Sequence, residues 1–135
     1  MYRSETYLEV RYYETDLMGI VHHSNYIRYF ECARHQALVD LGLPICKIEH
    51  MGIMMPVVSV ECHYKMPATR GDTLKIVSTV NEMPKVKIKI DSTIYNTNGD
   101  IICTGSVTLG FIHAENRRPT RVPAFISDLF APYFK

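Results

Sequence analysis

The chain has 135 residues, which is enough for one ordinary domain (1–135) and too few for a second core of similar size. Hydrophobic residues make up 47% and charged residues 21%, a soluble globular composition. The net charge of +1 gives no indication of nucleic-acid binding. The sequence has no run of ~18 apolar residues that would predict a membrane span, and "MYRSETYLEV" lacks the apolar segment of a signal peptide. We therefore expect a cytoplasmic protein.

The first part of the chain predicts a strand, a loop and a helix. Residues 5–13 have enough Val, Tyr and Leu for a strand, and "TDLMGIVHHS" then breaks any period and turns at Gly19. A helix is expected to begin at Ser24 or Asn25, both common N-cap residues. Its apolar positions recur at intervals of three and four, namely Tyr26, Ile27, Phe30, Ala33, Ala37, Leu38 and Leu41.

The helix is expected to end at Gly42 and Pro44, because glycine and proline commonly follow a last helical turn. Four later segments alternate with period two: "VVSVECHY", "TLKIVSTV", "VKIKID" and "SVTLGF". In the first of these, one face is expected to carry Val58, Val60, Cys62 and Tyr64. The Asn-Gly pair in "TNGD" predicts a type I′ hairpin, and "AFISDLF" predicts a short C-terminal helix.

These elements predict an α+β architecture with one long central helix and an antiparallel sheet of about five strands. Since the helix is the only element available to cover the sheet, the sheet must curl around it. A long sheet edge then stays open, and pairing with a second copy would close it, so we expect at least a homodimer.

The four cysteines, Cys32, Cys46, Cys62 and Cys103, form no C-x-x-C pair. Without a signal peptide this favours reduced thiols over disulfides or a zinc site. We expect these cysteines to be small buried hydrophobic residues.

Asp16 is the residue most suited to chemistry in the loop. A loop aspartate is most often only a turn residue. Here it precedes the helix by eight residues with Gly19 between, so the loop can fold back and bring the carboxylate to the helix N-terminus. That terminus has unpaired N–H groups and a partial positive charge. A carboxylate beside amides that can hold an oxyanion is what acyl transfer requires.

The adjacent His22 and His23 suggest a metal site at first. Neighbouring residues in an extended loop point in different directions, and no H-x-x-x-H or H-E-x-x-H spacing follows. We therefore expect no metal and no cofactor, and the imidazoles to orient the loop or line a pocket. Glu31 and Arg34, three apart on the helix, favour a surface ion pair over a second catalytic carboxylate.

The stretch "ETDLMGIVHHSNYIRYFECAR" resembles the signature of the 4-hydroxybenzoyl-CoA thioesterase family of hotdog-fold proteins, T-D-x-x-G-x-V followed by N-Y-x-x-[YF]-[FL]-E-x-A-R. It also resembles the bacterial acyl-CoA thioesterase subgroup encoded beside the Tol–Pal genes. "VVSVECHYKMPATRGDTLKI" is similar to the same family's second strand, P-A-x-x-G-D turn and third strand. The resemblance covers roughly residues 5–113.

The resemblance implies a hotdog fold in a homodimer or homotetramer, with the active site between subunits. It implies that Asp16 is the catalytic carboxylate and that the His23 amide polarises the thioester carbonyl. Lys85 and Lys87, at the turn between the third and fourth strands, would hold coenzyme A phosphates, with Arg117 and Arg118 as weaker candidates. Gly19, Asn25 and Tyr26 are expected to shape the substrate pocket.

The leading hypothesis from the sequence is hydrolysis of acyl-CoA to free acid and coenzyme A. An acyl-carrier-protein thioesterase could share every catalytic residue and differ only in its surface. A non-catalytic acyl-CoA-binding protein is the alternative from another class, although Asp16 argues against it. No G-x-S-x-G elbow, P-loop or G-x-G-x-x-G motif is present, which counts against serine hydrolases, kinases and dehydrogenases.

Overall fold

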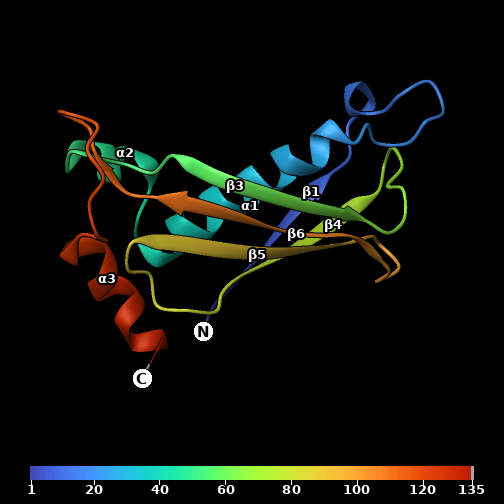
Figure 1. Ribbon diagram of the computed structural model, residues 1–135. Coiled ribbons are helices and arrows are strands. Elements are labelled where there is room, and N and C mark those ends of the chain that lie inside the picture. Colours follow the sequence, from blue (N-terminus) through green and yellow to red (C-terminus); the bar gives the residue numbers. More distant parts are fainter. Residues whose placement is uncertain (135) are drawn as a thin grey trace.

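An antiparallel sheet of five strands forms one layer of the molecule, with the order β1-β4-β5-β6-β3 (Figure 1). The computed structural model describes residues 1–134. The strands are β1 (Tyr2–Glu9), β3 (Val57–Tyr64), β4 (Thr73–Val80), β5 (Lys87–Tyr95) and β6 (Ile101–Gly110). The four segments with period two therefore all form strands, as predicted.

The first strand lies earlier than the predicted range 5–13. It ends at Glu9, and Tyr12–Glu14 form a short 3-10 helix, η1. The cause is local, because the Glu14 carboxylate accepts the Arg11 N–H at 2.8 Å and draws the chain into a turn. Val10 bonds to the turn at residues 71–72 and does not continue the strand.

Helix α1 (Ser24–Leu41) is the longest helix of the described residues and packs against β1 and β4 behind the sheet in Figure 1. It ends as predicted at Gly42, whose φ of 95° is the left-handed conformation of a C-cap. The N-cap is His23, and not Ser24 or Asn25. The prediction was wrong because the Asn25 side chain bonds to the preceding loop and does not cap the helix.

The buried face of α1 follows the predicted stripe, except that Ile27 is only half-buried and Tyr29, which was not predicted, is buried. Phe30 lies so close to β6 that a Cβ on Gly105 would stand 2.7 Å from its ring. A glycine in the middle of this strand thus lets the helix approach the sheet. Buried side chains of β4, β5 and β6 complete the core, including Leu74, Ile76, Ile88, Ile94 and Leu109.

Strand β3 does not have the buried face that its alternation predicted. Seven of its eight residues are exposed, and only Cys62 is half-buried. The strand lies at the edge of the sheet, where α1 packs on β1 and β4 and covers less of it. Its apolar side chains, including Val57, Val58 and Val60, are therefore left exposed on an open edge.

Several smaller elements lie at one end of the sheet. Helix α2 (Ile45–His50) and the two-stranded sheet of β2 (Ile53–Met54) and β7 (Ile112–His113) were not predicted. Helix α3 (Ala124–Phe130) confirms the predicted C-terminal helix, and a 3-10 turn, η2 (Ala131–Tyr133), follows it. No helix within residues 1–134 has the length and hydropathy needed to cross a bilayer.

The turn between β5 and β6 is not type I′. Within this turn only Gly99 has a positive φ, which is 87°, whereas a type I′ turn needs positive φ at both central residues. The side-chain oxygen of Asn96 accepts the N–H groups of Asn98 and Asp100 at 3.0 and 2.9 Å, and this side-chain turn selects the longer loop.

The four cysteines are free thiols. Cys103 is buried and Cys62 half-buried, but Cys32 and Cys46 are exposed, so the expectation of burial was wrong for these two. Cys32 lies on the side of α1 that faces away from the core.

Candidate active site

The segment between β1 and α1 closes into a loop around Asp16. Thr15 and Val21 face each other in an antiparallel bridge at its neck. The Asp16 N–H donates to the Ile20 carbonyl across 2.8 Å, and the Asp16 carbonyl accepts the Gly19 N–H at 3.1 Å. Gly19 has a φ of 77°, so it turns the chain in a conformation that other residues rarely adopt. Local hydrogen bonds thus set the backbone position of Asp16.

Glu14 fastens this loop to α1. Its carbonyl accepts the Asn25 side-chain amide at 2.9 Å and the His22 N–H at 3.0 Å. Its carboxylate accepts the Tyr29 hydroxyl at 3.0 Å, as well as the Arg11 N–H. Burial raises the pKa of Tyr29, so its phenol stays a donor near neutral pH. The loop is therefore held against two successive turns of the helix.

The turn after β3 supports the loop from its other side. The Val21 N–H donates to the Ala68 carbonyl at 2.8 Å, and Ile20 bridges to Thr69. The Ala68 N–H in turn donates to the Tyr26 hydroxyl at 3.1 Å. In Figure 1 the loop before α1 and the segment after β3 meet at one end of the sheet.

A cavity of about 300 Å³ lies where these segments meet. Its lining residues are Asp16, Ile20, Val21, His22, His23, Tyr26, Tyr64, Lys65, Met66 and Pro67. Three of the predicted site residues, Asp16, His23 and Tyr26, therefore share one cavity. Gly19 lies in the same loop but outside this lining, and Asn25 is buried behind it.

The Asp16 carboxylate is half-buried. Its Oδ1 accepts the Met18 N–H at 2.8 Å, which orients the side chain. Within residues 1–134 no other hydrogen bond and no ion pair engages this carboxylate. One oxygen is thus free to act on a molecule in the cavity.

The N-terminus of α1 opens on the same cavity. His23 already has helical backbone angles (φ −55°, ψ −29°), and its N–H has no acceptor among residues 1–134. A free N–H at a helix N-terminus carries the partial positive charge of the helix dipole. His23 and Asp16 line one cavity, so the two residues that the sequence suggested for acyl transfer lie together.

The two histidine rings do not point apart as expected. Their centroids lie 4.1 Å apart with an interplanar angle of 32°. His22 Nδ1 accepts the Ser24 N–H at 3.3 Å and lies 2.9 Å from the Ser24 hydroxyl. This ring therefore caps the first turn of α1, which brings it back beside its neighbour. No group of three or more His, Cys, Asp or Glu side chains in residues 1–134 is arranged to hold a metal ion.

Two tyrosines form the wall of the cavity. The rings of Tyr26 and Tyr64 meet edge to face with centroids 5.3 Å apart. The Tyr64 hydroxyl donates to the His23 carbonyl at 3.3 Å. Burial raises the pKa of Tyr26, so this phenol remains neutral near pH 7 and cannot replace Asp16 as the anionic group.

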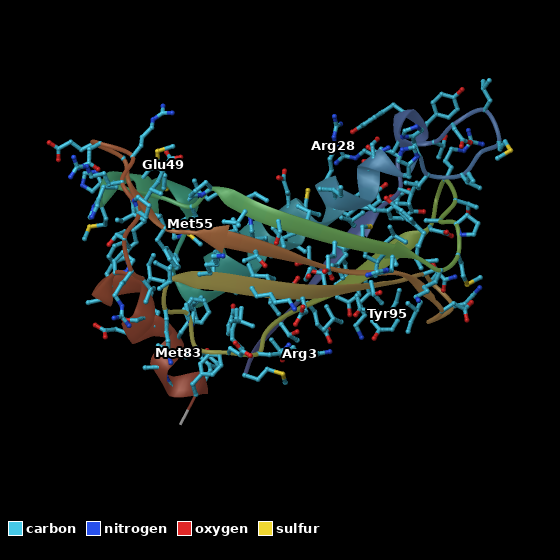
Figure 2. The ribbon with its side chains drawn as sticks, viewed as in Figure 1. Arg3, Arg28, Glu49, Met55, Met83 and Tyr95 are labelled. Carbon is cyan, nitrogen blue, oxygen red and sulfur yellow. The ribbon has the colours of Figure 1, made fainter. Side chains whose placement is uncertain are left out.

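Lys85 and Lys87 lie away from this cavity. Lys85 lies in the connection between β4 and β5, and Lys87 is the first residue of β5, where it pairs with Gly110 at the end of the sheet opposite Asp16. Figure 2 shows this end at Met83, beside α3, far from Arg28 near the start of α1. A single chain therefore does not bring the predicted phosphate-binding lysines to Asp16. The weaker candidates Arg117 and Arg118 follow β7 at the same distant end, and both are exposed.

The expected ion pair between Glu31 and Arg34 does not form. Glu31 is exposed, and the salt bridges of the described residues do not include Arg34. Arg34 instead has a buried Nη1 that reaches no hydrogen-bond partner. The cavity that Arg34 lines is built partly from α2 and β2, which were not predicted.

Sequence reasoning missed Tyr64, Lys65, Met66 and Pro67 as part of the site. The segment runs from the end of an alternating strand into Pro67, the first residue of the P-A-x-x-G-D turn, and neither pattern marks it as a cavity wall. The only usable signal was the cluster of large side chains just before that turn.

The sequence model of the thioesterase-like superfamily matches residues 10–130, which include the whole site. The chain belongs to this superfamily. YneP of Bacillus subtilis, a candidate acyl-CoA thioesterase, is 30% identical over 135 residues, which cover 100% of this chain and 98% of YneP. A chloroplast acyl-acyl carrier protein thioesterase of Arabidopsis thaliana is 21% identical over 97% of this chain and 69% of its own length.

Among solved structures, the 1,4-dihydroxy-2-naphthoyl-CoA (DHNA-CoA) thioesterase of Staphylococcus aureus superposes with a TM-score of 0.90. It is 31% identical to this chain and covers 98% of it, and 89% of the S. aureus chain is matched. This chain thus has the hotdog thioesterase fold that the sequence predicted, with an antiparallel sheet of five strands and a helix packed against it.

Proposed function

We propose that this chain hydrolyses acyl-CoA thioesters to a free carboxylic acid and coenzyme A. The observation that carries the proposal is that Asp16 and His23 line one cavity, with one Asp16 carboxylate oxygen and the His23 N–H at the start of α1 unpaired within residues 1–134. Superfamily membership and similarity to thioesterases support the reaction class.

In the proposed reaction, the thioester carbonyl oxygen accepts the His23 N–H. As the carbonyl carbon becomes tetrahedral, the negative charge on this oxygen is stabilised by the amide and the helix dipole. Removing one such donor from an enzyme typically costs roughly 100- to 1,000-fold in turnover. Asn25 and Tyr26 hold the loop and the cavity wall in place.

Asp16 can act in either of two ways. As a base, it takes a proton from the water that attacks the carbonyl carbon, and the C–S bond then breaks. As a nucleophile, it attacks the carbonyl itself, expels the coenzyme A thiolate and forms a mixed anhydride that water cleaves. Both routes consume one water and release an acid and a thiol. An acyl adduct on Asp16, trapped by rapid quenching and detected by mass spectrometry, would identify the nucleophilic route.

The active unit is proposed to be a homodimer or homotetramer joined along β3. In an antiparallel pair of β3 strands, the Tyr64 end of one copy meets the Val57 end of the other. Lys87 lies at the Val57 end, because both residues pair with the end of β6. A second copy would therefore bring its Lys85 and Lys87 to the Asp16 end, where they can bind coenzyme A phosphates.

The decisive test is Asp16→Asn, assayed by thiol release from a panel of acyl-CoA thioesters. The variant should keep its fold and substrate binding and lose turnover by orders of magnitude. Asp128→Asn, on the exposed side of α3, is the matched control and should behave as wild type. Turnover of Asp16→Asn close to wild type would overturn the assignment.

The same assay separates the alternatives when matched acyl-carrier-protein thioesters are added to the panel. Faster hydrolysis of matched acyl-carrier-protein thioesters would identify the chain as a thioesterase of that class. Tight acyl-CoA binding without thiol release would identify a non-catalytic binding protein. Closeness to the Tol–Pal-associated subgroup and a cytoplasmic location remain predictions from the sequence.

A further inference from the structure

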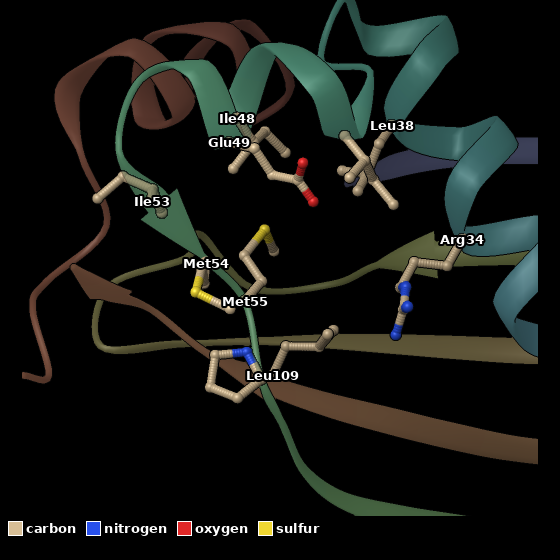
Figure 3. A pocket seen from close by; sticks show the side chains of 10 residues that line it. Arg34, Leu38, Ile48, Glu49, Ile53, Met54, Met55 and Leu109 are labelled. Carbon is tan, nitrogen blue, oxygen red and sulfur yellow. The ribbon is translucent and has the colours of Figure 1, made fainter. Parts of the chain in front are cut away.

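A second cavity, of about 240 Å³, lies near the other end of α1, between that helix, α2 and the segment from β2 to β3 (Figure 3). Its lining residues are Arg34, Leu38, Ile45, Ile48, Glu49, Ile53, Met54, Met55, Pro56 and Leu109. It shares no residue with the Asp16 cavity. Arg34 follows Tyr26 by eight residues, which is about 12 Å along a helix axis.

The walls of this cavity are apolar except for two charged side chains. Figure 3 shows Arg34 reaching in from α1 and Glu49 from α2, with Met54 and Met55 on the side of β2. Arg34 Nη1 is buried and has no hydrogen-bond partner in residues 1–134. Glu49 lines the cavity but forms no ion pair with Arg34.

A buried guanidinium nitrogen without an acceptor is costly, because burial removes water and nothing replaces its hydrogen bonds. Guanidinium groups bind carboxylates with particular strength, since their N–H groups match the two carboxylate oxygens. The remaining walls favour a hydrocarbon body. At about 240 Å³, the cavity is below the usual range for a drug-sized ligand and suits a small one.

We propose that this cavity binds a small carboxylic acid with an apolar body, such as a medium-chain or aromatic acid, with its carboxylate on Arg34. Such acids have the chemistry of the product that the proposed reaction releases, so the site would let product acid bind the enzyme. The binding claim itself does not depend on the role of Asp16. Glu49 at the same cavity would repel the carboxylate and keep the affinity moderate.

Calorimetric titration of the full chain with octanoate and with octanol tests the carboxylate claim. Octanoate should bind more tightly than octanol. Arg34→Met, which keeps an unbranched flexible side chain and removes the charge, should weaken octanoate binding at least tenfold and leave octanol binding almost unchanged. Glu49→Gln should tighten octanoate binding several-fold. Equal octanoate affinity in wild type and Arg34→Met would overturn the proposal, as would no octanoate binding to the wild type.

The place of binding is tested by NMR of methionine methyl groups. Octanoate should shift the signals of Met54 and Met55 and leave Met66, which lines the Asp16 cavity, unmoved. Shifts at Met66 alone would place the acid in the Asp16 cavity and refute the proposed site. If Arg34→Met does not fold, Met54→Trp provides a second test, because its indole should fill the cavity and abolish binding of both ligands. Undiminished octanoate binding to Met54→Trp would also refute the site.

Discussion

The side-chain amide of Asn25 donates a hydrogen bond to the backbone carbonyl of Glu14 across 2.9 Å. This bond connects the first turn of α1 to the loop that carries Asp16, and Asn25 is buried. The loop position therefore depends on a side chain that does not itself line the cavity.

Asn25→Ala is expected to lower both stability and turnover. In this variant the Glu14 carbonyl accepts only the His22 N–H, and the shorter side chain leaves a small void. The expected cost is roughly 1–3 kcal/mol in the free energy of unfolding. Asn25→Asp should be worse, because a carboxylate cannot donate to a carbonyl. Urea unfolding and thiol-release assays measure the two effects. Asn81→Ala, an exposed asparagine, is the control, and equal effects of both alanine variants would show that the Glu14 bond is unimportant.

Val60→Lys should separate the copies of the proposed dimer. Val60 is exposed on the edge strand β3, and a lysine there would bring like charges together when two β3 strands pair. Sedimentation should show a monomer that has lost most of its turnover. Tyr7→Lys places the same charge on the exposed surface of β1, the opposite edge, and should remain associated. A fully active Val60→Lys monomer would show that one chain suffices.

Gly105→Ala should be strongly destabilising. The added Cβ would collide with the Glu61 carbonyl and stand 2.7 Å from the Phe30 ring, so β3, β6 or α1 would have to move. Overpacking of this kind costs about 1–3 kcal/mol or more. Gly110→Ala, on the same strand, meets only Val58 at 3.6 Å and should change the unfolding midpoint little. Equal midpoints for the two variants would contradict this account of the packing.

Stability should fall in strongly alkaline solution, partly through Tyr2. Burial, reinforced by the Asp40 carboxylate, raises the pKa of Tyr2 to about 12, from about 10 in the unfolded chain. Between these values the folded protein retains a proton that the unfolded chain loses, so raising the pH lowers the free energy of unfolding. Below about pH 10 the contribution is fully present.

Tyr2→Phe tests this account. Unfolding measured from about pH 9 to 12 should show a shallower loss of stability for the variant, because its ring has no proton to lose. The variant should also be less stable at neutral pH, since it lacks the hydrogen bond from the Tyr2 hydroxyl to the Ala37 carbonyl. An unchanged slope would mean that Tyr2 does not titrate in this range.

Much of the fold follows from local patterns in the sequence. The apolar stripe from Tyr26 to Leu41 and the glycine at residue 42 set the extent of α1, because both act within a few residues along the chain. The alternation in β4, β5 and β6 likewise identifies buried faces such as that of Leu74 and Ile76. The motif around Asp16 likewise predicts a loop followed by a helix, because its residues are close together in the sequence.

The remaining features depend on contacts between distant segments. The N-cap is His23 and not the predicted Ser24 or Asn25, because the Asn25 side chain bonds to Glu14. Strand β3 does not have the predicted buried face, because it lies at the edge of the sheet. Periodicity reports which side chains share a face, but it does not report whether another element covers that face.

The two cavities also combine features set by local sequence with features set by contacts between distant segments. Asp16 and the helix N-terminus lie within one short stretch, so the sequence alone predicts that one precedes the other. The packing of distant segments is what places Tyr64 and Met66 in the wall of the Asp16 cavity, Lys87 at the far end of the sheet, and Arg34 in an apolar pocket. Each of these depends on strand order and helix packing, which join residues many positions apart.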